Sequence, residues 1–191
     1  MAFIENKLAT LLAWFGISIY EWKKTLSDLF AELIAGECYL RIRRGPDGQL
    51  VLERVLEIVK MIVCDPNNPG RGFLKEVSVT LPGTEGKTME RDRVPSGKIR
   101  IGKETPNEAL VRETGEELEL KPDEYRFDLI ETFEEQGNPK TAYMGLLSVY
   151  VIHKFQVAPV SHAHVFRDEF TVREEDGTIH TFRWVTEEKK K

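Results

Sequence analysis

Three glutamates near the middle of the chain have the clearest chemical potential in the sequence. Glu113, Glu116 and Glu117 are spaced i, i+3 and i+4, so on a helix their carboxylates lie on one face. Like charges at this spacing repel by about 0.2–0.5 kcal/mol per pair on an exposed helix. A divalent cation would offset the repulsion, because neighbouring carboxylates can converge on an ion held at about 2.0–2.1 Å, as magnesium prefers. The alternative is an ordinary solvated helix face, on which Arg112 neutralises part of the charge.

A helix must carry these glutamates, and the sequence marks where it begins. The run Thr105-Pro106-Asn107-Glu108 has the pattern of a capping box with proline at the first helical position. The residues predicted to form the buried stripe of the helix are Ala109, Leu110, Val111, Thr114 and Leu118. This assignment places the three glutamates on the face opposite to that stripe.

Residues 97–120 resemble the sequence motif of the Nudix family. The family pattern is a glycine, five residues, a glutamate, seven residues and then Arg-Glu-apolar-x-Glu-Glu-x-Gly-apolar. This chain has Gly97, Glu104 and the run from Arg112 to Leu120 in the corresponding places. Phe182-Arg183-Trp184-Val185-Thr186-Glu187-Glu188 is also similar to the closing strand of many members, so the resemblance covers about residues 38–188.

Nudix proteins hydrolyse a diphosphate bond in a nucleoside diphosphate linked to another group, using Mg²⁺ or Mn²⁺. The resemblance implies that Glu113, Glu116 and Glu117 are metal ligands, together with a main-chain carbonyl near Gly97. One of these glutamates, with Glu116 and Glu117 as the candidates, would also take a proton from the attacking water. The bound ions would neutralise the charge of the diphosphate and position that water.

The resemblance also suggests supporting residues. Arg112 would orient the glutamates, and Glu104 would support the geometry of the loop and the helix. The candidate cations for the phosphate side of the substrate are Lys98, Arg91 and Arg93, each of which could instead be a solvated surface residue. In many family members an acid from a later loop also takes part. The sequence offers four such acids and does not choose among them: Glu134, Glu135, Glu174 and Glu175.

Three departures from the family pattern leave a second interpretation open. Six residues separate Gly97 from Glu104, Thr114 replaces the usual apolar residue, and Glu119 occupies the position of the usual glycine. We expect the extra residue to bulge around Gly102, since glycine adopts backbone angles closed to other residues. Glu119 would either extend the helix or strain its exit. The alternative function is therefore a catalytically inactive Nudix-fold protein that binds a nucleotide derivative or has a regulatory role.

The rest of the sequence predicts a mixed α/β fold, arranged as a Nudix-like α/β/α sandwich around a mixed sheet. Turn residues and β-branched or alternating apolar residues predict strands over residues 38–64, 77–81, 125–133, 143–155 and 178–185. Residues 52–62 are also compatible with a helix. Strong turn signals occur at residues 45–48 and 136–140.

The N-terminal residues 3–35 predict one or two helices. The apolar run from Leu8 to Tyr20 is shorter than the roughly 20 residues that a membrane-spanning helix needs. We therefore expect no transmembrane segment and a division into an N-terminal helical extension, residues 1–36, and a Nudix domain, residues 37–191. Packing of the helices on their own domain is the preferred interpretation. Contact with a second subunit in a homodimer and docking on a membrane surface are the alternatives.

Composition limits the partners. The chain has 191 residues, 41% of them hydrophobic, and 27 basic against 32 acidic residues give a net charge of −5. A mainly electrostatic grip on nucleic acid needs a basic surface, so no specific nucleic-acid partner is expected. A small phosphorylated molecule needs only a few local cations or a metal. Two cysteines are too few for a disulfide scaffold, which favours a reducing, cytoplasmic setting.

Overall fold

The computed structural model describes residues 2–83, 87–137, 142–160 and 164–186. In these residues the helices are α1 (Ala2–Trp14), α2 (Leu26–Ala35) and α3 (Pro106–Leu118), with short 3-10 turns at Pro69–Arg71 and His164–Phe166. The strands are β1 (Tyr39–Arg44), β2 (Leu50–Val63), β3 (Phe73–Thr80), β4 (Thr88–Arg93), β5 (Ser96–Lys98), β6 (Tyr125–Gln136), β7 (Leu147–Pro159), β8 (Glu169–Arg173) and β9 (Ile179–Val185).

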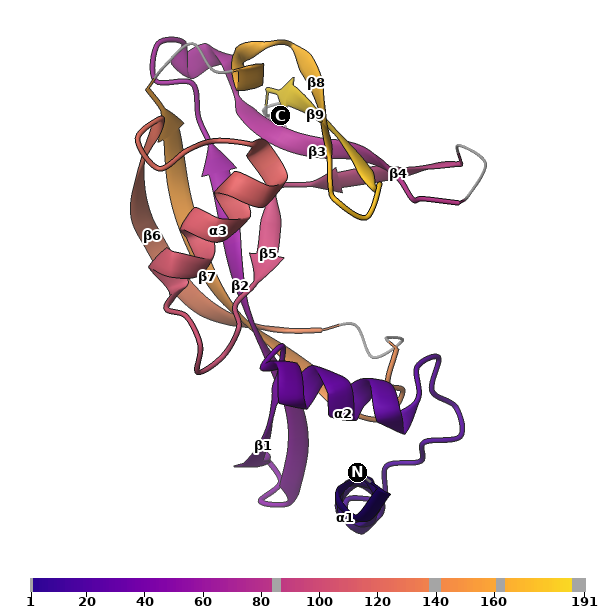
Figure 1. Ribbon diagram of the computed structural model, residues 1–191. Helices are drawn as coiled ribbons and strands as arrows, with labels where there is room; N and C mark the ends of the chain where they lie inside the picture. The colour runs from indigo at the N-terminus through magenta and orange to yellow at the C-terminus, as the bar shows by residue number, and fades with distance from the viewer. Residues whose placement is uncertain (1, 84–86, 138–141, 161–163, 187–191) are drawn as a thin grey trace. The chain divides into compact units, whose positions relative to one another are not determined.

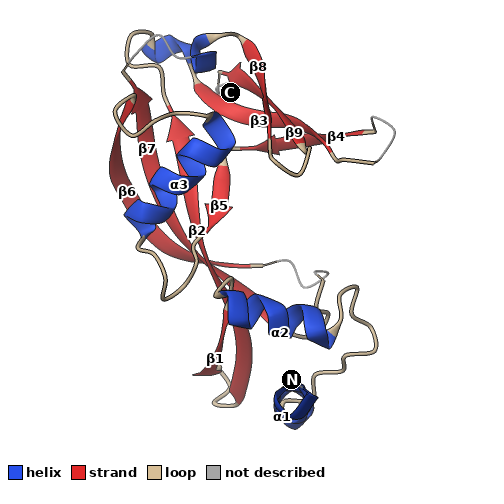
Figure 2. Ribbon diagram, in the orientation of Figure 1, coloured by secondary structure: helices blue, strands red, loops and turns tan. Residues whose placement is uncertain are grey.

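The strands form two sheets (Figures 1 and 2). The first has the order β1-β2-β7-β6, and β5 also pairs with β2. The second has the order β4-β3-β9-β8, in which every neighbouring pair with a determined register is antiparallel. The predicted mixed α/β class is confirmed. No helix in the described part of the chain is long and apolar enough to cross a bilayer.

The chain divides into two compact units, each built from three segments. Unit 1 contains Met1–Ile58, Lys98–Thr105 and Phe133–Ile152, and unit 2 contains Val59–Gly97, Pro106–Thr132 and His153–Lys191. Residues 1–36, which the sequence suggested as a separate extension, thus belong to a unit that also includes β1 and parts of later strands.

The helix α2 of unit 1 has clear start and stop signals. Thr25 caps α2: its hydroxyl accepts from the Asp28 N–H at 3.1 Å, and its own N–H donates to the Asp28 carboxylate at 2.7 Å. The helix ends at Gly36, whose φ of 77° is left-handed and suits glycine. The capping residues are local, so the sequence alone could predict this helix.

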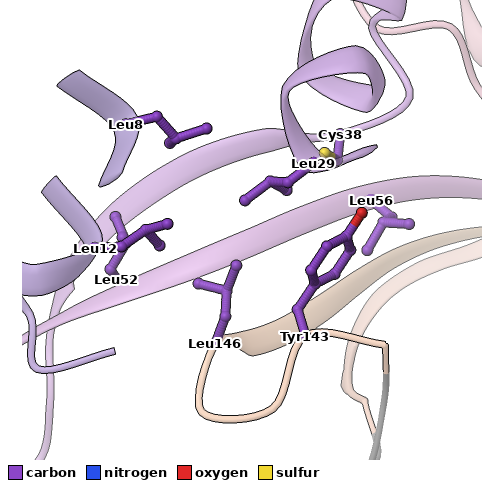
Figure 3. Close-up of a cluster of buried hydrophobic side chains, with 8 residues drawn as sticks. All are labelled: Leu8, Leu12, Leu29, Cys38, Leu52, Leu56, Tyr143 and Leu146. Carbon is purple, nitrogen blue, oxygen red and sulfur yellow. The ribbon is translucent and has the colours of Figure 1, made fainter. Parts of the chain in front are cut away.

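One hydrophobic cluster holds unit 1 together (Figure 3). Its buried members come from α1, α2, the segment between α2 and β1, β2 and the turn before β7: Leu8, Leu12, Leu29, Cys38, Leu52, Leu56, Tyr143 and Leu146. Leu12 and Leu29 are fully buried there, so both helices pack on their own chain, as the preferred interpretation predicted. Burying a leucine side chain contributes about 1.5–3 kcal/mol.

A buried ion pair also ties α2 to β2. Glu32 is 6% exposed and Arg54 is 7% exposed, and their charged groups meet at 2.5 Å. The other Glu32 oxygen accepts from Lys24 Nζ at 2.8 Å and from the Tyr143 hydroxyl at 3.0 Å. Burial disfavours ionisation of Glu32, but the bonds from Lys24 and Arg54 outweigh it and lower its pKa. Glu32 is therefore a buried carboxylate whose charge is compensated.

Unit 2 contains the second sheet, α3 and residues 96 and 97 of β5. The apolar side chains buried in it include Val59, Met61, Val63, Leu74, Val79, Leu110, Leu118, Phe155, Phe170 and Phe182. The register of β3 against both of its neighbours shifts between Glu76 and Ser78, which marks a bulge in β3. The bulge lies next to Glu76, a buried carboxylate that belongs to the site described below.

Most of the predicted strands are present. Residues 39–44 and 50–63 form β1 and β2, so residues 52–62 are a strand and not a helix. The predicted strand over 143–155 begins only at Leu147, because residues 143–146 form a turn that buries Tyr143 and Leu146. Residues 138–140 of the predicted turn lie outside the described residues. The sequence analysis missed β4, whose residues are all exposed and show no apolar alternation.

Candidate functional site

The helix α3 begins at Pro106, as predicted, and ends at Leu118. Glu119 follows with a φ of 51°, and it is the one residue other than glycine with a positive φ among the described residues. Its N–H donates to the Gly115 carbonyl at 3.1 Å, a bond typical of helix ends. Two outcomes were expected for Glu119: a longer helix, or backbone strain at the helix end. The structure has the second, because α3 ends at Leu118 and Glu119 has a left-handed φ.

The prediction that all three glutamates lie opposite the buried stripe of the helix is wrong for Glu113 and Glu117. Glu113 and Glu117 are each 8% exposed, whereas the Glu116 side chain is 52% exposed. The physical reason is the width of the buried side of α3. Residues 110, 113, 114, 117 and 118 are three or four positions apart, so they form one continuous face. Two carboxylates are therefore buried on the same face as Leu110 and the other apolar residues of the helix.

The short strand β5 lies directly against these two carboxylates. A Cβ atom built on Gly97 would overlap the carboxylate of Glu113, so this carboxylate lies in space that any larger residue at position 97 would take from it. The N–H of Ser96 donates to Glu117 Oε2 at 3.1 Å. The backbone of residues 96 and 97 thus contacts both buried glutamates, which is the neighbourhood that the sequence analysis expected for Gly97.

The electrostatics of this pair are unfavourable for two ionised carboxylates. Burial, with the charge of Glu113 as the second cause, raises the pKa of Glu117 from 4.5 to about 8. Arg93 and His180 act in the opposite direction but do not outweigh burial. A buried carboxylate that resists ionisation near neutral pH is a common feature of functional sites.

Arg112 bridges the other side of the cluster. Its Nη1 atom donates to Glu113 Oε1 at 2.6 Å and to Glu116 Oε2 at 2.9 Å. These are the contacts expected of a residue that orients the glutamates. Glu116 faces Arg112 and solvent, so its carboxylate has a different environment from those of Glu113 and Glu117.

The second sheet contributes charged residues that the sequence analysis did not identify as a group. Glu76 on β3 is 1% exposed, forms an ion pair with Arg93, and lies 2.9 Å from Nδ1 of His180 on β9. Burial disfavours ionisation of Glu76, but the bonds from His180 and Arg93 lower its pKa. The bond to Glu76 raises the pKa of His180. No motif marks these residues, because they are single charged positions on strands about 100 residues apart.

The series of contacts between charged side chains continues from His180 to Glu174, in the turn between β8 and β9. Nε2 of His180 lies 3.0 Å from Glu174 Oε1, without the geometry of a hydrogen bond. Glu174 also lines an open cleft of about 550 Å³. The cleft is bounded by Gly115, Glu116, Glu119, Arg173, Glu174, Glu175 and Asp176. Of the four later acids, Glu174 and Glu175 therefore share a cleft with Glu116, while Glu134 binds Arg41 in unit 1.

The remaining predicted residues are not gathered at one place. Arg91 is exposed on β4, and Arg93 is paired with Glu76. Lys98 and Glu104 belong to unit 1, where Lys98 forms an ion pair with Glu37 at 2.5 Å. The charge of Arg93 lowers the pKa of Glu117, which ties this candidate cation to the buried pair.

The loop before α3 has the backbone that the extra residue requires. Gly102 has a φ of 74°, in the turn where the bulge was expected. The Arg100 carbonyl accepts from the N–H groups of Lys103 and Glu104 at 2.9 and 3.2 Å. In return, the Arg100 N–H donates to Glu104 Oε1 at 2.8 Å, so Glu104 closes this turn.

The site is compatible with a hard divalent cation in part. The buried carboxylates of Glu113 and Glu117 lie beside Gly97, and carboxylate oxygens are the kind of ligand that Mg²⁺ prefers. A cation would also favour the ionised form that burial disfavours. Within the described ranges, however, no three side chains of His, Cys, Asp or Glu are grouped closely enough to hold a metal. Glu116 would have to leave Arg112 to join the other two.

Comparisons with known proteins add little to this geometry. No family model and no curated protein matches the chain. A solved structure, DR0079 from Deinococcus radiodurans, is similar over 69% of this chain and 67% of its own, with 16% identity and a TM-score of 0.39. A likeness of this degree says nothing about activity.

Proposed function

We propose that this protein is a metal-dependent hydrolase of the Nudix type, which cleaves a diphosphate bond in a nucleoside diphosphate derivative. The observation that supports the proposal best is the buried pair Glu113 and Glu117 against Gly97, where a Cβ atom would overlap a carboxylate. A glycine directly against a buried carboxylate, and a second buried carboxylate whose pKa is raised to about 8, fit a metal site better than a solvated helix face.

In this proposal Glu113 and Glu117 hold Mg²⁺ or Mn²⁺ together with main-chain oxygen near Gly97, and Glu116 joins them by leaving Arg112. When bound, the metal supplies charge neutralisation for the diphosphate. Arg112 holds the acid cluster in place. Arg93 is the preferred candidate cation for the phosphate side, because its charge acts on Glu117.

The cleft gives a preference among the later acids. Glu174 and Glu175 line it together with Glu116, so they are better candidates for an additional acid than Glu134. The substrate is a small molecule in this proposal. The cytoplasmic location and the homodimer remain predictions from the sequence.

One observation favours the alternative, a Nudix-fold protein that binds a nucleotide derivative without cutting it. The exit of α3 is strained at Glu119, and Glu116 faces Arg112, so the three acids do not form one ligand set. In the alternative this arrangement persists when the ligand is bound, and no metal brings Glu116 to the other two glutamates.

A hydrolysis assay separates the two functions. The full chain would be incubated with Mg²⁺ or Mn²⁺ and a panel of nucleoside triphosphates, nucleotide sugars, ADP-ribose and dinucleoside polyphosphates. Products would be separated by chromatography, with EDTA as the metal-free control. We expect turnover of at least one substrate that EDTA abolishes. Binding of a panel member by calorimetry without any turnover would favour the alternative.

Variants connect the activity to the site. Glu113→Gln and Gly97→Ala should each lower turnover by about 100-fold or more, because each disturbs a preorganised charged site. Glu131→Gln is the matched control, since Glu131 forms an ordinary exposed pair with Lys154 at 2.9 Å. Metal-dependent turnover that survives unchanged in both site variants would refute the assignment.

A further inference from the structure

The C-terminal end of α2 is in backbone contact with the loop that precedes α3. We call this loop, residues 98–103, the inserted loop, and both segments belong to unit 1. The Ile101 N–H donates to the Gly36 carbonyl at 2.8 Å. A Cβ atom on Gly36 would lie 2.8 Å from the Ile101 carbonyl oxygen, too close for any residue but glycine without displacement.

Two lysines of the inserted loop also reach the end of α2. Lys103 Nζ donates to the Ala35 carbonyl at 2.9 Å, and Lys98 Nζ lies 2.5 Å from the Glu37 carboxylate. A helix C-terminus attracts cations, because its last carbonyls are unpaired and carry partial negative charge. The contacts involve residues at the start, the middle and the end of the inserted loop, so they restrain its whole length.

The inserted loop is continuous with both parts of the candidate site. Lys98 directly follows Gly97, whose backbone lies against Glu113. Lys103 is followed by Glu104 and then by the start of α3, the helix that carries the acids. The inserted loop contains a left-handed turn at Gly102, and a turn of this kind needs support to keep one conformation.

We propose that α2 is a positioning element for the candidate site, and that Gly36 and Glu37 are the positioning residues through which it acts. They hold the inserted loop, and the inserted loop in turn keeps Gly97 against Glu113. The effect on metal binding and turnover depends on the proposed function, whereas the contact between α2 and the inserted loop does not. The N-terminal helices thus have a role beyond covering apolar surface.

Trypsin tests the contact directly, because the inserted loop contains its cleavage sites Lys98, Arg100 and Lys103. In Gly36→Ala the new methyl group displaces Ile101, and we expect cleavage within the inserted loop to become about tenfold faster. Gly48→Ala is the matched control. Gly48 has a φ of 80°, close to the 77° of Gly36, but a Cβ atom there meets nothing within 4 Å. Equal cleavage rates in the two variants would overturn the inference.

A milder pair of variants covers the case in which Gly36→Ala does not fold. Glu37→Gln removes one ion pair whose side chains are 45% and 39% exposed, and it should speed cleavage of the inserted loop about twofold to threefold. Glu131→Gln removes a pair of similar exposure between β6 and β7, and it should leave that cleavage unchanged. Indistinguishable patterns for the two variants would also overturn the inference.

Binding of Mn²⁺ alone, followed by electron paramagnetic resonance on the full chain, tests the positioning role. Gly36→Ala should weaken Mn²⁺ binding about tenfold or more and lower kcat more than it raises KM, while Gly48→Ala changes neither. Faster loop cleavage with unchanged Mn²⁺ affinity and kcat would refute the positioning role. Failure of the proposed function gives a different result: no form of the chain hydrolyses the panel, and cleavage of the inserted loop still increases in Gly36→Ala, which supports the contact.

Discussion

Replacing Glu117 by glutamine should stabilise the protein in the absence of metal, and the gain should depend on pH. Glu117 is buried, and its pKa rises from 4.5 to about 8 in the folded state. The folded state therefore binds its proton more tightly than the unfolded state. Stability falls as pH rises from about 4.5 to about 8, because unfolding releases this proton over that range.

The magnitude follows from the pKa shift. Each pKa unit corresponds to about 1.4 kcal/mol, so at pH 7 the carboxylate lowers the free energy of unfolding by about 3 kcal/mol. At pH 5 the same calculation gives less than about 1 kcal/mol. Glutamine is neutral at both pH values and keeps the shape of the side chain. Glu117→Gln should thus exceed the natural chain in stability by these amounts.

Urea unfolding in EDTA, followed by circular dichroism at pH 5 and pH 7, measures the difference. Glu116→Gln is the matched control on the same helix, because the Glu116 side chain is 52% exposed and its removal should change stability by less than about 1 kcal/mol at either pH. Saturating Mn²⁺ should stabilise the natural chain more than Glu117→Gln, since a cation favours the ionised acid. A stability difference of the same size at both pH values would refute the reasoning.

Two further predictions concern the end of α3 at Glu119 and the buried ion pair of unit 1. Glu119→Gly should raise the free energy of unfolding by about 0.5–1 kcal/mol and the thermal midpoint by about 2–3 °C. The left-handed conformation costs a residue other than glycine about 1–2 kcal/mol, and part of this gain is lost because glycine makes the unfolded chain more flexible. Glu119→Ala keeps the strain and should show no such gain in a thermal scan, so equal gains in the two variants would contradict the idea. Arg54→Met should lower the free energy of unfolding by about 3–5 kcal/mol in urea, because it leaves Glu32 buried without its main partner. Replacing Glu32 by leucine in addition should recover much of the loss, and a single variant as stable as the natural chain would show that the pair is not a buried charge pair.

The sequence by itself determined the local features of this protein. The start of α3 at Pro106 and the helical structure in residues 3–35 depend on capping residues and apolar periodicity, which act over a few residues. Residues 52–62 fitted a strand or a helix by their pattern, and pairing with β1 and β7 makes them part of a strand. The spacing of Glu113, Glu116 and Glu117 was also visible, as was the unusual Glu119 at the position where the helix ends.

The tertiary structure decided which of those features face each other. It buried Glu113 and Glu117 while leaving Glu116 exposed, because burial depends on what packs against the helix and not on helical spacing alone. It brought His180 to Glu76 from 104 positions away, and it brought the end of α2 to the inserted loop. Contacts between distant segments follow from the way strands and helices pair in three dimensions, and no local pattern of residue types records that pairing.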